Sequence, residues 1–249
     1  MPPWKFHPDA SCRNPDSVLF PLAAGADTPR VTRGLIFDLD GTLVHSLPGL
    51  ALSLNRALAE MGMPQHPEET VRGFVGNGAH ILAIRALPGG ASDADVATLE
   101  AAFKRHYAVA WPTGSTPFPG VMDLLLALQQ RGEIIAVLSN KPHPFTTEMV
   151  ATLFPGIRFT AVLGQKPGLP HKPDAAPALA LAAELGLPPQ SCTIIGDSTV
   201  DLQTAKNAGM RAVAVTWGYH NIPALRAERP DTMVDTPEAL ANLLAEPAS

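Results

Sequence analysis

Short apolar runs rich in β-branched residues alternate with segments of helical periodicity from Arg33 onward. This alternation is typical of a parallel sheet whose strands are joined by crossover helices. It therefore predicts an α/β fold. The expected strands cover residues 34–38, 133–139, 159–163, 192–196 and 211–216, and the expected helices between them cover 120–130, 144–153, 175–185 and 200–208.

Nearly one hundred residues separate the first two expected strands, far more than one crossover helix requires. Apolar residues recur at helical spacing over 50–61, 78–87 and 93–109, and prolines such as Pro64 separate these segments. We therefore expect a small helical cap at 46–116, inserted into a core made of residues 33–45 and 117–249.

The composition excludes several classes of function. The chain has 249 residues, 46% of them apolar, and a formal charge of −5 without a dense block of Lys and Arg. This argues against nucleic-acid binding and against a polybasic membrane anchor, and no apolar run approaches transmembrane length. Cys12 and Cys192 fit neither a disulfide framework nor a zinc site, so a reducing cytoplasm is expected. The sequence leaves open whether the protein is a monomer or a homodimer.

The first 32 residues are rich in proline and turn-forming residues. Pro21 interrupts their one apolar patch, at 18–24, and two acids precede that patch. We expect a loose N-terminal extension, although a cleaved secretory leader or a misassigned translation start would also account for this segment.

Two carboxylates stand at the end of the first expected strand, in Asp38-Leu39-Asp40-Gly41-Thr42. Like charges this close raise each other's proton affinity unless a cation neutralises them. The segment therefore indicates a bound metal ion or a carboxylate that stays partly protonated.

Three further polar clusters lie at or near expected strand ends, where open parallel sheets bind their ligands. They are Ser139-Asn140, Lys172, and Gly196-Asp197-Ser198 with Asp201. Each alone has a structural interpretation, as a turn, an exposed lysine or a helix cap. Their joint placement favours a functional site.

The order of these motifs resembles the haloacid dehalogenase superfamily of aspartyl-nucleophile phosphohydrolases, over about residues 33 to 220. The resemblance implies a Rossmann-like core with central strand order 5-4-1-2-3, flanked by helices, and it identifies the early insertion with the α-helical cap of the family. It also implies hydrolysis of a small phosphorylated metabolite with Mg²⁺ as cofactor.

By this resemblance, Asp38 attacks phosphorus to form an aspartyl-phosphate, and Asp40 protonates the leaving alkoxide and later deprotonates the hydrolytic water. Lys172 would neutralise phosphoryl oxygens, and Ser139 and Asn140 would donate hydrogen bonds to them. The remaining implied roles belong to the metal ligands Asp38, Asp197 and the backbone carbonyl of Asp40, and to the supporting residues Gly41, Thr42 and Asp201.

Some less specific segments of the sequence resemble those of the phosphoglycolate phosphatase branch of the superfamily. They include Phe118-Pro119-Gly120-Val121 and the segment from Arg72 to Gly78. Arg72 and the amides of Gly76, Asn77 and Gly78 are candidates for binding the substrate carboxylate, although Gly-Asn-Gly also suits a tight turn.

Other functions compete with that of a phosphoglycolate phosphatase. A β-phosphoglucomutase-like sugar phosphomutase, a phosphatase for another small metabolite and an inactive binding module stay open. A phosphonoacetaldehyde hydrolase is disfavoured, because the lysine that its Schiff base requires could only be Lys104, which we expect on the surface.

Overall fold

A six-stranded parallel sheet forms the centre of the computed structural model, which describes residues 33–245; the expected N-terminal extension lies outside the described residues. The spatial order of the strands is β5-β4-β1-β6-β7-β8. The strands are β1 (Gly34–Phe37), β4 (Ile134–Pro142), β5 (Ala161–Gln165), β6 (Cys192–Gly196), β7 (Arg211–Val215) and β8 (Thr232–Val234). The expected order 5-4-1-2-3 is thus present, with a sixth strand, β8, paired with β7 at one edge.

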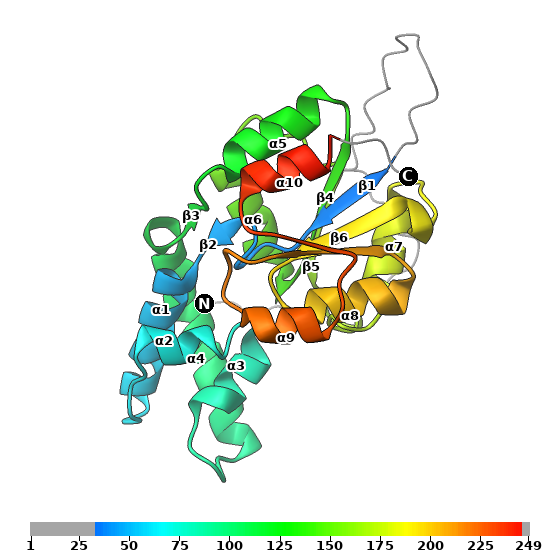
Figure 1. Ribbon diagram of the computed structural model, residues 1–249. Helices are drawn as coiled ribbons and strands as arrows, with labels where there is room; N and C mark the ends of the chain where they lie inside the picture. The colour runs from blue at the N-terminus through cyan, green and yellow to red at the C-terminus, as the bar shows by residue number, and fades with distance from the viewer. Residues whose placement is uncertain (1–32, 246–249) are drawn as a thin grey trace, which may run out of the picture. The chain divides into compact units, whose positions relative to one another are not determined.

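Helices cover both faces of this sheet (Figure 1). Those of the core are α5 (Val121–Gln130), α6 (His143–Leu153), α7 (Ala176–Glu184), α8 (Thr199–Ala208), α9 (Ile222–Ala227) and α10 (Pro237–Leu243), with a short 3₁₀ turn at Pro189–Ser191. Side chains alternate across a strand, so Leu35 and Phe37 of β1 pack into one apolar cluster with Leu125 of α5, whereas Ile36 packs into a second with Leu181 of α7. The fold is therefore the predicted Rossmann-like α/β architecture.

Four helices interrupt this core between β2 (Val44–His45) and β3 (Thr116–Pro117), which pair with each other as a two-stranded antiparallel ladder. They are α1 (Leu47–Glu60), α2 (Glu68–Arg72), α3 (Gly78–Ala86) and α4 (Asp93–Gly114). We call residues 47–114 the helical insertion. Its helical character agrees with the periodicity of the sequence, while its division from the core as a cap stays a prediction.

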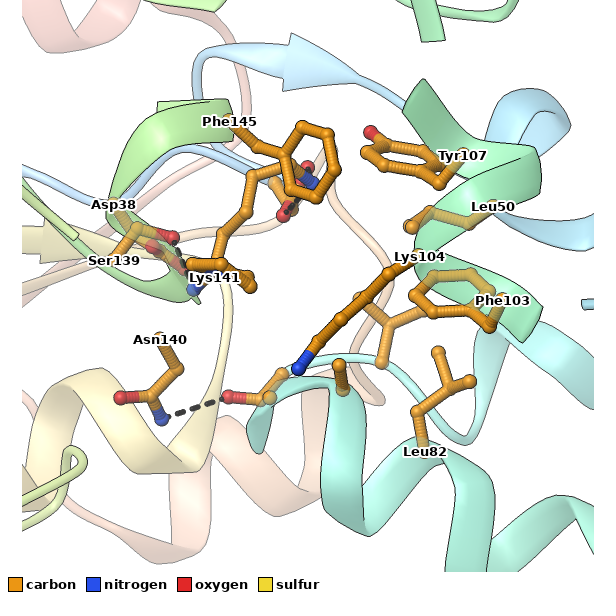
Figure 2. A pocket seen from close by; sticks show the side chains of 16 residues that line it. Asp38, Leu50, Leu82, Phe103, Lys104, Tyr107, Ser139, Asn140, Lys141 and Phe145 are labelled. Carbon is orange, nitrogen blue, oxygen red and sulfur yellow. Dashed lines mark hydrogen bonds and ion pairs between the residues drawn. The ribbon is translucent and has the colours of Figure 1, made fainter. Parts of the chain in front are cut away.

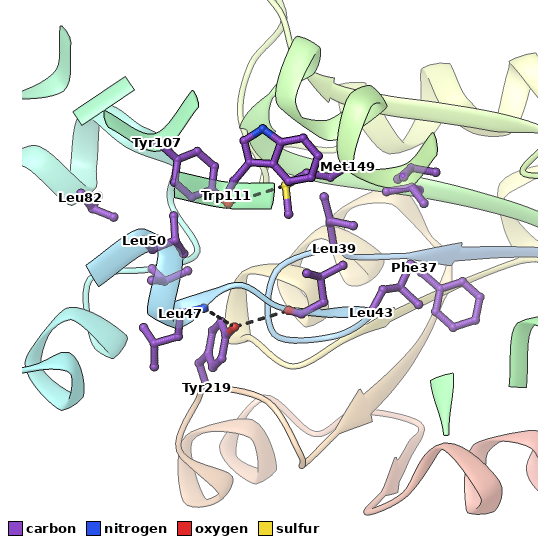
Figure 3. Packing of buried hydrophobic residues seen from close by; sticks show 14 of the residues in the cluster. Phe37, Leu39, Leu43, Leu47, Leu50, Leu82, Tyr107, Trp111, Met149 and Tyr219 are labelled. Atoms are coloured by element: carbon purple, nitrogen blue, oxygen red, sulfur yellow. Dashed lines mark hydrogen bonds between the residues drawn. The ribbon is translucent and has the colours of Figure 1, made fainter. Parts of the chain in front are cut away.

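The apolar interior runs without a break from the sheet into the helical insertion. Figure 3 shows Leu39 and Leu43, just after β1, beside Leu47 of α1 and Trp111 of α4. The hydroxyl of Tyr219, which follows β7, accepts hydrogen bonds from the backbone N–H groups of Ser46, at 2.7 Å, and Leu47, at 3.1 Å. These contacts fix the point where the chain leaves the core, and so they fix the position of α1 beside the carboxyl end of β1.

Candidate active site

The predicted site residues gather at the carboxyl end of the sheet because β1 is flanked by β4 and β6. Phe37 pairs in register with Val137 on one side and with Ile195 on the other. Asp38 therefore emerges between the ends of β4 and β6, and its backbone N–H donates to the Ile195 carbonyl at 2.9 Å. Residues more than 150 positions apart in the chain become neighbours here.

Three buried carboxylates form the acidic part of the site. Asp38, Asp197 and Asp201 each offer one carboxylate oxygen, and these oxygens lie within 4.8 Å of one another. Burial and the charge of Asp201 raise the pKa of Asp38 to about 7, although Lys172 opposes the shift. Burial and the charges of Asp201 and Asp38 raise the pKa of Asp197 to about 8. Carboxylates this crowded require a compensating cation to ionise together.

Lys172 supplies part of that positive charge. Its ammonium lies 2.9 Å from Asp38 Oδ1 and 2.6 Å from Asp201 Oδ1, and it donates to the Leu138 carbonyl at 3.0 Å. Burial would lower the pKa of Lys172, but Asp201 and Asp38 raise it above the ordinary range, so the side chain is cationic. Asp38 Oδ1, which forms this ion pair, is buried and lies on the side of Asp38 that faces Lys172.

Asp201 orients the lysine and also caps a helix. Its second oxygen accepts from the Ser198 hydroxyl at 2.6 Å and from the Ser198 backbone N–H at 3.2 Å, which completes a capping box at the start of α8. The helix cap that the sequence suggested is therefore provided by Ser198 and Asp201. Asp197 takes no part in it and faces the site.

The turn after β1 positions Asp197. The Thr42 hydroxyl donates to Asp197 Oδ1 at 3.1 Å and accepts from the Asp197 backbone N–H at 3.1 Å. Gly41 has a φ of +86°, and a Cβ atom at this position would lie 2.3 Å from Asp197 Oδ2. A Cβ at Gly218 would lie equally close to the Asp197 carboxylate. Only glycine fits on both sides of this carboxylate.

Asp40 contacts a buried cation that was absent from the predicted site. Lys141 Nζ donates to its two carboxylate oxygens at 2.7 and 2.9 Å, and the Ser46 hydroxyl donates to Oδ1 at 2.5 Å. The lysine side chain is only 4% exposed, and its ammonium lies 4.5 Å from the centre of the Tyr107 ring. The available sequence signal was a lysine directly after Ser139-Asn140 at the end of a buried strand, where lysine is rare.

Asn140 lines the pocket and links parts of the chain around it, and its hydrogen bond to phosphoryl oxygens stays a prediction. Its amide donates to the carbonyls of Gly76, at 3.1 Å, and Lys172, at 3.0 Å, and its oxygen accepts from the Lys172 backbone N–H at 2.8 Å. The side chain therefore joins the core, the Lys172 loop and the helical insertion. Ser139 lines the pocket, and its hydroxyl oxygen accepts from the Lys141 backbone N–H at 3.2 Å.

A small pocket, about 50 Å³ in volume, lies between these groups and the helical insertion (Figure 2). Asp38, Asp40, Ser139 and Lys141 line its floor. The opposite wall is mainly apolar. Its larger side chains are Leu50, Val75, Leu82, Phe103, Tyr107 and Phe145.

The predicted carboxylate-binding segment reaches this pocket only in part. Gly76 and Gly78 line it, and both have positive φ angles, as a tight turn requires. Asn77 instead accepts a hydrogen bond from Arg85, at 2.9 Å. Arg72 donates to the Gly218 carbonyl at 3.0 Å and does not line the pocket, because its guanidinium turns toward the loop after β7.

Lys104 lies closer to the site than the sequence suggested. It extends from α4 into the pocket (Figure 2), although its side chain is 42% exposed and its ammonium contacts Glu100 at 2.5 Å. The 42% exposure agrees with the surface position expected from the sequence, and the same side chain also lines the pocket.

The residues present fit a divalent cation with oxygen ligands. The carboxylate oxygens of Asp38, Asp197 and Asp201 cluster at one place, and Gly41 and Gly218 leave room for the Asp197 carboxylate there. Hard cations prefer such carboxylate sites. Within the described part of the chain, no helix combines the length and the apolarity needed to cross a membrane.

Comparison with known proteins agrees with this geometry. The profile of the family described as haloacid dehalogenase-like hydrolase matches residues 35–215. The phosphoglycolate phosphatase of Pectobacterium atrosepticum is 37% identical over 206 residues, which cover 82% of this chain and 88% of the relative. That of Pseudomonas putida is 38% identical over 222 residues, covering 87% and 81%.

A solved structure gives the same result. The crystal structure of a predicted phosphoglycolate phosphatase from Haemophilus somnus superposes with a TM-score of 0.79 at 33% identity, and the match covers 86% of this chain and 98% of that one. The chain therefore belongs to the haloacid dehalogenase-like hydrolase family and resembles its phosphoglycolate phosphatases.

Proposed function

We propose that the protein hydrolyses a small phosphomonoester through an aspartyl-phosphate on Asp38. The observation that carries this proposal is the buried Asp38 carboxylate, which lines the pocket with one oxygen 2.9 Å from the Lys172 ammonium. A carboxylate needs no base to become a nucleophile, but its approach to an anionic phosphate requires nearby positive charge. Lys172 provides such a charge next to the attacking group.

In the first step, a carboxylate oxygen of Asp38 bonds to phosphorus while the bond from phosphorus to the ester oxygen breaks. Asp40 gives its proton to the departing oxygen, so the product leaves as an alcohol. In the second step, Asp40 takes a proton from water, the water oxygen bonds to phosphorus, and the Asp38 carboxylate is released. The position of Asp40 at the pocket floor, two residues from Asp38, supports this division of labour.

We assign Mg²⁺ as the cofactor, which the carboxylates of Asp38 and Asp197 would hold together with the backbone carbonyl of Asp40. When bound, the ion offsets negative charge on the nucleophile and on the phosphoryl oxygens. Thr42 and Tyr219 orient Asp197 for this role, since the Thr42 hydroxyl and the Tyr219 backbone N–H each donate to one of its oxygens.

The substrate that we propose is 2-phosphoglycolate, with glycolate and phosphate as products. The names of the relatives support this choice, and so does the small cavity, whose 50 Å³ corresponds to only about three to five water molecules. A β-phosphoglucomutase-like reaction on a hexose phosphate is the second candidate, because it uses the same nucleophile. We further propose that the enzyme works in the cytoplasm.

The test is release of phosphate from 2-phosphoglycolate, a hexose 1-phosphate and p-nitrophenyl phosphate, with Mg²⁺ and with EDTA. We expect Mg²⁺-dependent release, highest in kcat/KM for 2-phosphoglycolate. Asp38→Asn should remove turnover while its circular dichroism spectrum stays that of the wild type. Wild-type turnover in this variant would refute the nucleophile assignment, and conversion of the hexose 1-phosphate to its 6-phosphate would favour the mutase.

A further inference from the structure

Lys141 is a buried cation in the pocket whose partner is the proposed acid–base residue. Both contacts between its ammonium and Asp40 are short, at 2.7 and 2.9 Å. Burial would lower the pKa of Lys141, but Asp40 and Tyr107 raise it above the ordinary range, so the ammonium stays charged. Because Lys141 lines the pocket, this buried positive charge attracts an anion that binds there.

The other cations near the pocket are engaged differently. Lys172 already faces Asp38, Asp201 and the Leu138 carbonyl, so its donors are committed to the nucleophile side of the site. Lys104 is 42% exposed and paired with Glu100. Solvent therefore weakens the attraction that it can exert on an anion.

The position of Lys141 relative to Asp40 determines which anion it can reach. A general acid must lie about 2.6–3.2 Å from the oxygen that it protonates. In a 2-phosphoryloxy carboxylate, the carboxylate is attached to the carbon that carries this ester oxygen, so its own oxygens lie within roughly 3.5 Å of the ester oxygen. When the ester oxygen lies beside Asp40, a cation bonded to Asp40 is therefore on the side of the pocket where that carboxylate binds.

We propose that Lys141 binds a substrate carboxylate carried on the same carbon as the phosphate ester oxygen, so that the enzyme selects 2-phosphoryloxy carboxylates. This inference rests on the proposed phosphatase function and names its substrate class. The pocket wall supports it, because Leu50, Leu82 and Phe103 offer a carboxylate no polar partner. A carboxylate buried there without a cation would lose its hydration uncompensated.

Tyr107 keeps the ammonium in place. Its ring lies 4.5 Å from Lys141 Nζ, and its hydroxyl donates to Met149 Sδ at 3.6 Å, which anchors the ring against α6. The lysine is thus held between the core and α4 of the helical insertion. A fixed ammonium can discriminate by distance, so a carboxylate one carbon farther from the ester oxygen should be bound less well.

The test compares substrates that differ only in this charge. For the wild type and for Lys141→Met, kcat/KM is measured on 2-phosphoglycolate and on its neutral carboxamide analogue, 2-phosphoglycolamide. Loss of the contact between Lys141 and Asp40 lowers kcat/KM equally on the acid and on the amide, so this effect cancels in the ratio of the two kcat/KM values. The ratio therefore isolates the carboxylate contact. We expect the wild type to prefer the acid, and Lys141→Met to reduce this preference about 10- to 100-fold, as for other charged hydrogen bonds.

Lys104→Met is the matched control, since it removes a lysine that also lines the pocket. Its ratio should stay within about twofold of the wild-type ratio because its charge is exposed and already paired. Lys141→Arg retains the charge and should retain more of the preference than Lys141→Met. Thermal unfolding checks that each variant is folded.

One comparison needs no variant. Wild-type kcat/KM should also be higher for 2-phosphoglycolate than for 3-phosphoglycerate, in which the carboxylate is farther from the ester oxygen. Equal values would overturn the inference even if Lys141→Met did not fold.

The outcomes distinguish failure of the proposed role of Lys141 from failure of the proposed phosphatase function. If Lys141→Met left the ratio of kcat/KM for the acid to kcat/KM for the amide unchanged, or if Lys104→Met lowered this ratio instead, the role of Lys141 would be overturned while the phosphatase assignment stands. An equal loss of kcat/KM on 2-phosphoglycolate and 2-phosphoglycolamide would mean that Lys141 contacts only the phosphate group or Asp40, which also overturns its role in carboxylate binding. Absence of phosphate release from any ester by the wild type would overturn the proposed function itself.

Discussion

Gly41→Ala should damage the site much more than it damages the fold. The backbone of Gly41 has a φ of +86°, and an added Cβ would lie 2.3 Å from Asp197 Oδ2. A side chain at positive φ costs about 1–2 kcal/mol, or roughly 2 to 8 °C in Tm for a chain of this size. The contact adds to this cost, and we expect it to be relieved by displacement of the Asp197 carboxylate from its place beside Asp38.

Gly132→Ala provides the matched control. Gly132 also has a positive φ, +72°, but an added Cβ would meet no atom within 4 Å. Urea unfolding should show the backbone cost in both variants. Only Gly41→Ala should also lower kcat and raise the Mg²⁺ concentration required for half-maximal phosphatase activity, by about tenfold or more if one ligand contact worth 1.4 kcal/mol is lost.

A Gly41→Ala enzyme whose activity and Mg²⁺ dependence matched those of Gly132→Ala would refute this reasoning. It would mean that Asp197 tolerates displacement, and hence that its carboxylate is not a metal ligand.

Two further predictions concern protons. Ser46→Ala removes the hydroxyl that donates to Asp40 at 2.5 Å. We expect kcat to fall about tenfold on 2-phosphoglycolate but less on p-nitrophenyl phosphate, because the leaving group of the latter needs little protonation. Ser53→Ala removes another buried hydroxyl and should leave the ratio of the two kcat values unchanged. Without metal, the free energy of unfolding should fall as the pH rises from 5 to 8. The reason is that Asp38 and Asp197 have pKa values of about 7 and about 8 in the folded state. They therefore keep protons that the same side chains release near pH 4 in the unfolded chain. Added Mg²⁺ should restore stability most at pH 8, and a Tm in EDTA that is flat or rises over this range would contradict the raised pKa values.

Local patterns in the sequence were sufficient for the main elements of the core. The apolar runs at β1, β4, β6 and β7 are long enough to be recognised, and they set the layers of the fold. The three residues of β8 and the short helices α2, α9 and α10 carry too little periodicity to be identified alone. The helical periodicity ends at residue 109, whereas α4 continues past Pro112 to Gly114, and Trp111 in this last part packs into the core.

The strand pattern is enough to predict which groups reach the carboxyl end of the sheet, because a side chain that follows a buried parallel strand must emerge there. Asp38 and Asp197 are placed by that rule. Which of these groups contact each other depends on the fold as a whole. The contact between Lys141 and Asp40 joins residues 101 positions apart, and the Asn140 amide joins Gly76 to the backbone of Lys172 beside the pocket. Such pairings depend on strand order and on the placement of the helical insertion, and no local pattern of residues encodes either.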